Sequence, residues 1–156
     1  MHWVVRLIER IVIALMAVIA ATVIIEVVIR DLLEMSLAVH EELTRYLMIW
    51  VAMLGSVLLT HEDGHIRIAI LPDAVSPRVS AWLRTAADVI VVFFLVVFVY
   101  SSAANLPSIA GQNTITLGVG MIWFHAALPV GGVLMLIVAT RNLAVHLSQA
   151  MSGAQA

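Results

Sequence analysis

The chain has 156 residues, of which 63% are hydrophobic and only 12% are charged, and its mean hydropathy is +1.09. A soluble domain is about half apolar and a quarter charged, so this composition indicates an integral membrane protein. The formal charge is -2, all eight basic residues are arginines and no basic run occurs, so nothing in the chain supports nucleic-acid binding. Because cysteine is absent, disulfides, thiolate metal sites and a cysteine nucleophile are excluded.

Four apolar stretches follow one another along the chain, at about residues 7–29, 43–60, 77–104 and 121–140. Each is close to the roughly 20 residues that a helix needs to cross a bilayer. The third starts with Ser76 as an N-cap and Pro77 at the first helical position. An uncharged segment with several glycines, 105–120, separates it from the fourth. We therefore predict an all-α integral membrane protein, a single membrane domain over residues 1–156 that forms a four-transmembrane-helix bundle.

The first stretch has a competing interpretation as a secretory signal peptide. Arg6 and Arg10 precede it, and Val18-Ile19-Ala20 resembles a cleavage site. The apolar run nevertheless continues to Ile29, which is longer than a typical signal-peptide core, so a retained transmembrane helix is favoured.

Arginine placement predicts the orientation. By the positive-inside rule, both termini are expected to be cytoplasmic, because the connection between spans two and three and the two ends carry most of the arginines. Trp3 and Trp82 would then lie at the cytoplasmic interface and Trp123 at the outer one, while Trp50, inside span two, is expected to pack against another helix. The arginines on the predicted cytoplasmic side are Arg6, Arg10, Arg67, Arg78, Arg84 and Arg141.

Residues 61–65 read HEDGH, which matches the H-E-x-x-H pattern of zinc proteases. That chemistry needs both histidines on one face of an intact helix and a third ligand. Here the motif falls where span two leaves the membrane, Gly64 favours a helix end, and no glutamate follows Glu62. A solvated helix end explains the motif better, and an intramembrane zinc protease stays the third hypothesis.

Other polar residues admit both a structural and a functional interpretation. Glu41, Glu42 and Arg45 form an EExxR cluster at the predicted outer start of span two. Acidic residues favour a helix N-terminus, and Glu41 can pair with Arg45 one turn later. Charges near the membrane are also costly and usually face protein, so the same cluster suits contact with a partner subunit.

Two further pairs, Glu26 with Arg30 and Arg84 with Asp88, repeat the spacing of one helical turn and suit self-contained ion pairs.

The histidines raise a second hypothesis. His125 is the only histidine that we expect at any depth in the membrane, and with His40 it would suit a bis-histidine haem. A haem- or quinone-binding anchor subunit of a respiratory complex is therefore the main alternative function. The competing interpretation is a histidine hydrogen-bonded to a neighbouring helix.

Small residues recur at the spacing of helix contacts. Ala52 and Ser56 flank Gly55 in span two, and Gly131 lies in span four, so close helix packing is expected there. Pro129 with Gly131 and Gly132 predicts a kink in span four. No broken-helix pattern, internal repeat or ATP-binding loop accompanies them, which is typical of a subunit without a substrate site of its own.

The order of these features resembles the small membrane subunit of tripartite ATP-independent periplasmic (TRAP) transporters, the DctQ-like family. The resemblance covers nearly the whole chain, although its individual motifs are short. Acidic Glu62-Asp63 departs from the family, where a basic residue often stands. The matching positions are Glu41, Glu42, Arg45, Trp50 and Gly55 in span two, Gly64 and His65 at its exit, and Trp123, Pro129 and Gly131 in span four.

The resemblance implies a set of partners and no catalysis. A large permease subunit would carry the substrate and sodium sites, and a periplasmic solute-binding protein would deliver the solute, usually an organic acid anion. This chain would be a multi-pass protein of the bacterial inner membrane, surrounded by membrane lipid, with no cofactor, metal or catalytic residue. It would brace the permease, and its outer loops would help to dock the binding protein.

Overall fold

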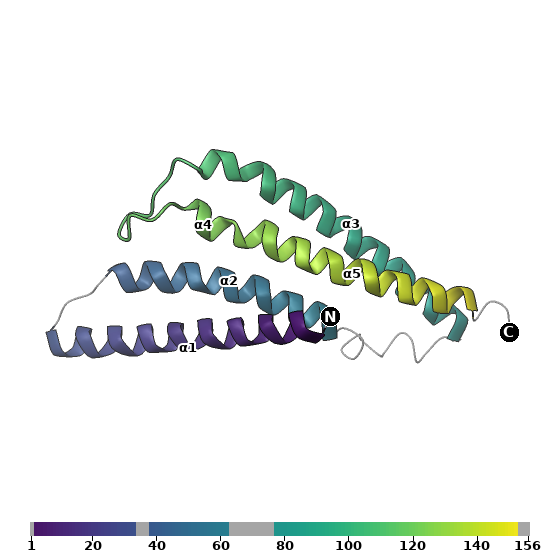
Figure 1. Ribbon diagram of the computed structural model, residues 1–156, viewed down its shortest axis with the longest axis horizontal. Coiled ribbons are helices and arrows are strands. Elements are labelled where there is room, and N and C mark those ends of the chain that lie inside the picture. Colours follow the sequence, from purple (N-terminus) through teal and green to yellow (C-terminus); the bar gives the residue numbers. More distant parts are fainter. Residues whose placement is uncertain (1, 34–37, 63–76, 153–156) are drawn as a thin grey trace.

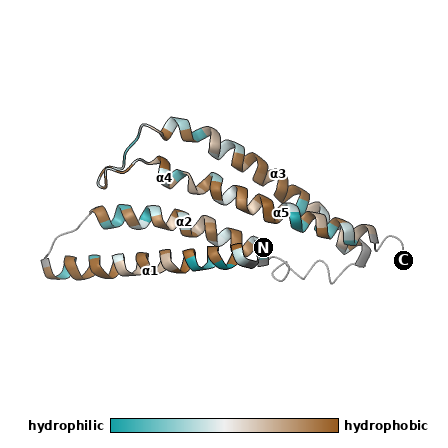
Figure 2. Ribbon diagram, viewed as in Figure 1, coloured by the Kyte–Doolittle hydropathy of each residue, from teal (hydrophilic) through white to brown (hydrophobic). Residues whose placement is uncertain are grey.

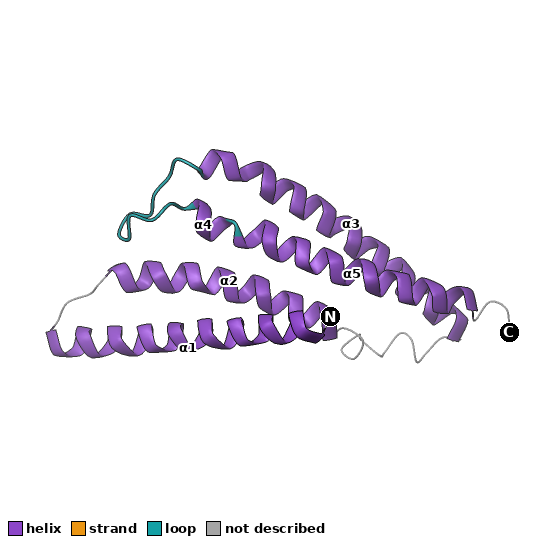
Figure 3. Cartoon of the chain, in the orientation of Figure 1, coloured by secondary structure: helices purple, strands orange, loops and turns teal. Residues whose placement is uncertain are grey.

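The computed structural model of the chain describes residues 2–33, 38–62 and 77–152 (Figure 3). Its helices are α1 (His2–Leu33), α2 (Ala38–Glu62), α3 (Pro77–Ile109), α4 (Ile122–His125) and α5 (Ala127–Ser152). Four stretches are long and apolar enough to cross a membrane, the last of them combining α4 and α5 over Ile122–Met151. The predicted all-α, four-helix membrane protein is therefore confirmed.

The helices are longer than the spans expected from the sequence. The fourth continues to Ser152 instead of ending near residue 140. The first, α1, extends from His2 to Leu33 instead of from about residue 7 to residue 29. The segment expected to be an uncharged loop from Asn105 is also helical as far as Ile109, with Pro107 inside the last turns of α3. A proline near a helix end removes only one backbone hydrogen bond, which explains why α3 passes through it.

The four long helices lie in a single layer in the order α1, α2, α5, α3 (Figure 1). Among the described residues, α1 contacts only α2, and α3 contacts only α5 and the short α4. Burial follows this order: 28% of the apolar window in Ile122–Met151 is buried, against 6% in each of the two edge helices. Both broad faces of the layer are consequently open to lipid or to other proteins, and the helices themselves consist mostly of hydrophobic residues (Figure 2).

A heptad seam joins α1 to α2. The less exposed residues of α1 recur at alternating steps of three and four, the pattern of helices that pack nearly antiparallel with a slight supercoil. Ile8 and Thr22 are its two buried members, and the Thr22 hydroxyl donates to the Val18 carbonyl at 2.8 Å, so it needs no partner from α2. The seam comprises Val5, Ile8, Val12, Leu15, Ile19, Thr22, Glu26 and Ile29.

α5 lies between α2 and α3 because two adjacent glycines bring it close to both. A Cβ atom built on Gly131 would lie 2.8 Å from Cβ of Met53 in α2. A Cβ atom on Gly132 would lie 2.8 Å from Cγ2 of Val99 in α3. Successive residues of a helix point about 100° apart, so one glycine of the pair faces each neighbour. Close helix packing at Gly131 is thus present in the structure.

The kink expected at Pro129 corresponds to a short irregularity in the fourth span. The helix is interrupted at Ala126, between α4 and α5, where the backbone keeps helical dihedrals of φ -61° and ψ -21°. Pro129 has no N–H to donate to the His125 carbonyl four residues earlier, which accounts for the position of the break. Val130 restores the regular pattern by donating to Ala126 O at 3.1 Å.

Candidate functional site

The EExxR cluster meets the only described connection between long helices, the loop of residues 110–121. The Glu42 carboxylate accepts three backbone hydrogen bonds from consecutive loop residues. Oε1 accepts from Ile115 N at 3.0 Å, and Oε2 accepts from Thr116 N at 2.8 Å and Leu117 N at 3.0 Å. Consecutive N–H groups that converge form an anion-binding concavity, and here a carboxylate of the same chain occupies it.

The loop itself is a small hairpin that presents these amides. Asn113 and Gly120 form an antiparallel bridge, and Thr114 N donates to Val119 O at 2.8 Å. Gly118 closes the turn with φ +66°, a conformation that favours glycine. With its amide directed at Glu42, Ile115 is left 95% exposed at the tip.

One helical turn further along α2, an aromatic pair continues this contact. The rings of Tyr46 and Phe124 are stacked, with centroids 4.1 Å apart and an interplanar angle of 15°. Tyr46 is buried, so the stack closes the space between α2 and α4. Glu42 and Tyr46 together hold the loop and the start of the fourth span against α2; we call this arrangement the α2–loop clamp.

The other charged members of the cluster do not take part in the α2–loop clamp. Glu41 and Arg45 are exposed, and no ion pair joins them in the described part of the chain, although their spacing predicts one. Trp123 is likewise 71% exposed. The described residues therefore do not contain the expected Glu41–Arg45 pair, Glu42 has a structural role within the chain, and contact of Glu41 and Arg45 with a partner subunit stays a prediction.

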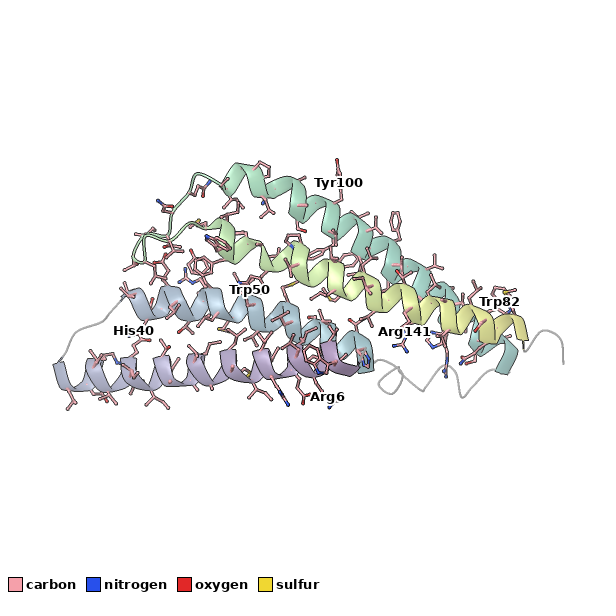
Figure 4. All side chains as sticks on the ribbon, in the orientation of Figure 1. Arg6, His40, Trp50, Trp82, Tyr100 and Arg141 are labelled. Atoms are coloured by element: carbon pink, nitrogen blue, oxygen red, sulfur yellow. The ribbon has the colours of Figure 1, made fainter. Side chains whose placement is uncertain are left out.

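Of the remaining predicted site residues, some pack within the chain and others do not. Trp50 packs against the core cluster of Ile8, Leu54, Val57 and Val138, as expected for a tryptophan inside a span (Figure 4). In contrast, a Cβ atom on Gly55 would meet nothing within 4 Å. Pro129 lines a shallow apolar hollow on α5, and Gly64 and His65 lie outside the described residues.

A buried polar contact that the sequence interpretation missed joins α3 to α5. Nδ1 of His146 lies 2.6 Å from Oδ2 of Asp88, and the two side chains are 18% and 5% exposed. His146 reaches Asp88 because α5 continues past residue 140 and runs back along α3. The expected depth of His125 in the membrane stays a prediction. Asp88, a carboxylate within an otherwise apolar stretch, was the signal that a polar partner had to be nearby.

The haem hypothesis requires His40 and His125 to face one another. Nδ1 of His125 lies 3.1 Å from the Met121 carbonyl in its own turn, and His40 is two residues, or about 200° of helix, from Glu42, which faces the loop. Nδ1 of His40 is buried without a hydrogen-bond partner among the described residues. His40 therefore lies on a different side of α2 from the loop-facing Glu42, and the Nδ1 atom of His125 is engaged within its own turn.

The HEDGH segment is only partly described. His61 lies in the last turn of α2, which ends at Glu62, and the following residues of the motif lie outside the described ranges. No group of three or more metal-ligating side chains occurs in the described part of the chain.

Fold and site together define a class of protein: a helical membrane subunit whose polar groups hold helices and a loop in place. The chain matches the family model described as the DctQ component of tripartite ATP-independent periplasmic transporters over residues 19–149. This match covers most of the chain, so the chain belongs to the DctQ family of TRAP transporter small subunits. It is a multi-pass protein of the bacterial inner membrane and a transporter component, not an enzyme.

Two named relatives agree with this assignment. The chain is 31% identical over 87 residues to a putative TRAP transporter small permease protein of Haemophilus influenzae, a match that covers 56% of this chain and 54% of that protein. It is 26% identical over 127 residues to the sialic acid TRAP transporter small permease protein SiaQ of Vibrio cholerae, covering 81% of this chain and 73% of the relative. The first match thus spans about half of the relative's length.

Proposed function

We propose that this chain braces the large permease subunit of a TRAP transporter and contributes its loop 110–121 to docking of a periplasmic solute-binding protein. The transported solute would be an organic acid anion, taken up together with a coupling ion. The α2–loop clamp is the observation that carries this proposal. In it the Glu42 carboxylate and the stacked Tyr46–Phe124 pair hold an exposed loop in a defined position. The positive-inside prediction puts that loop on the periplasmic side.

The bracing role rests on the open layer. A layer one helix thick leaves apolar side chains on both of its broad faces, and a Cβ atom built on Gly55 in α2 would meet no atom of the described residues within 4 Å. Small residues on a membrane helix allow another helix to approach closely. Gly55 and Ala52, an exposed neighbour one turn earlier, therefore suit a helix of the large permease.

The experiment compares Gly55→Leu with Gly131→Leu in the complete transporter expressed in its own membranes. Gly55→Leu should leave this chain folded and inserted but greatly reduce the large permease that co-purifies with it. Gly131→Leu should instead lower the amount of folded chain, because Met53 already occupies the space. If the permease co-purifies normally with Gly55→Leu, the α2 face does not brace it.

Docking is tested separately by Ile115→Asp, with Thr116→Ala as the matched control in the same exposed tip. The aspartate should reduce uptake that depends on the binding protein while the large permease still co-purifies. Unchanged uptake at limiting binding-protein concentration would exclude a docking role for the loop.

A further inference from the structure

The first turns of α1 carry a hollow that differs in chemistry from the rest of the layer. It has a volume of about 80 Å³ and is lined by Trp3, Arg6, Leu7 and Arg10. The four positions fall within about 100° of the helix circumference and lie opposite the seam that packs on α2. Figure 4 shows Arg6 at this edge of the layer. The hollow therefore opens away from the other helices.

From this arrangement we propose that the hollow binds the headgroup of a phospholipid with a net negative charge. An arginine guanidinium forms two parallel hydrogen bonds to a phosphate, and two arginines one turn apart provide two such donors about 6 Å apart along the axis. A zwitterionic headgroup carries a phosphate too, but its cationic group would meet these positive charges. The site thus selects an anionic phospholipid over a zwitterionic one.

The apolar residues of the hollow point to a lipid instead of a soluble phosphate. Trp3 is 76% exposed and Leu7 is 47% exposed, and both lie at the end of the apolar stretch Trp3–Leu32. Tryptophan is enriched at the boundary between headgroups and acyl chains. Further along the helix the same side of α1 carries the exposed Ala14, Ala17, Ala21 and Ile24, against which an acyl chain can lie.

One acidic residue, Glu9, is exposed beside the two arginines and lowers the net positive charge of this helix end. Its removal tests whether the charge of this helix end determines lipid binding. Glu9→Gln should strengthen binding of an anionic phospholipid, whereas removal of either arginine should weaken it.

The test uses the purified full-length chain, together with any permease that co-purifies, after exchange into detergent without lipid. Phosphatidylglycerol or phosphatidylcholine is added, and native mass spectrometry measures the affinity of the first bound lipid. Phosphatidylglycerol should bind more tightly than phosphatidylcholine. A basic residue near an anionic surface is worth about fivefold in affinity, so the double variant Arg6→Gln with Arg10→Gln should lose roughly 25-fold for phosphatidylglycerol alone.

Arg30→Gln is the matched control, because Arg30 is exposed on the same helix at its other end. It should leave the affinity for phosphatidylglycerol unchanged, and Arg6→Lys with Arg10→Lys should lose less than the glutamine pair. Equal lipid binding by the wild type and the glutamine pair would overturn the proposal. Displacement of phosphatidylglycerol by millimolar inorganic phosphate would also overturn it, since the ligand would then be a soluble anion.

Discussion

His146 and Asp88 lie 2.6 Å apart across the interface between α3 and α5, and both side chains are largely shielded from solvent. Such a contact contributes to helix association because a polar group that is buried without a partner is costly. Apolar packing supplies most of the neighbouring contacts, so this pair gives α3 and α5 a defined register.

We expect Asp88→Ala and His146→Ala to destabilise the chain non-additively. Polar contacts between membrane helices contribute about 0.6 kcal/mol on average and up to about 2 kcal/mol, and this short, buried pair should lie toward the upper end. The measurement is a double-mutant cycle on unfolding in mixed micelles. Asp88→Ala combined with His125→Ala serves as the control, because His125 hydrogen-bonds within its own turn and should show additive effects. A coupling energy indistinguishable from that control would mean that the pair does not hold the two helices together.

Gly131→Ala should lower the stability of the chain by about 1–3 kcal/mol, because its new methyl group overlaps Cβ and Cε of Met53. Thermal unfolding in detergent measures the loss. Gly55→Ala is the matched control in α2 and should be neutral or slightly stabilising, since its methyl group meets nothing within 4 Å.

The overlap at Gly131 also predicts that a second substitution, at Met53, relieves the destabilisation caused by Gly131→Ala. Met53→Gly removes both atoms that the new methyl group would meet, so the double variant Gly131→Ala with Met53→Gly should be less unstable than the sum of the single changes. Strict additivity would show that α5 moves away from α2 instead of overlapping Met53.

Glu42→Gln should release the tip of loop 110–121. A carboxylate offers acceptors on both oxygens, whereas an amide in either orientation turns a donor toward at least one of the three backbone N–H groups. Hydrogen exchange at the amides of residues 115–117 should become several-fold faster, with no change in α3. Glu41→Gln, the exposed neighbour, should leave exchange unaltered; if both variants behave alike, Glu42 does not restrain the loop in the membrane.

Phe124→Ala should weaken the attachment of α4 to α2. Stacked aromatic pairs contribute about 0.5–1.5 kcal/mol beyond the area that they bury, so the loss should exceed that range once the lost burial is added. The stability of Phe124→Leu, which keeps apolar volume without a ring, separates the two contributions. If Phe124→Leu retains full stability, the ring geometry contributes nothing.

The sequence predicted correctly those features that depend on a single property of one segment. The apolar length of each stretch determined the number of membrane helices, because a bilayer admits no other way to satisfy the backbone in these segments. The order of polar, aromatic and small residues in the second and fourth spans also led to the correct family, which the match over residues 19–149 confirms. Helix ends were less accurate, because a helix can continue beyond its most apolar stretch, as α5 does to Ser152.

Only the tertiary structure decided which residues meet. Glu42 and the amides of residues 115–117 are more than 70 positions apart, and nothing local in either segment indicates the other. The same holds for Asp88 with His146, whose contact requires α5 to lie antiparallel beside α3. The sequence predicted that helices form, because helix formation by an apolar segment depends on that segment and on the lipid around it. The order of the helices in the layer depends instead on which helix surfaces fit together. Gly131 and Gly132 fit against Met53 and Val99, and this fit is visible only in the tertiary structure.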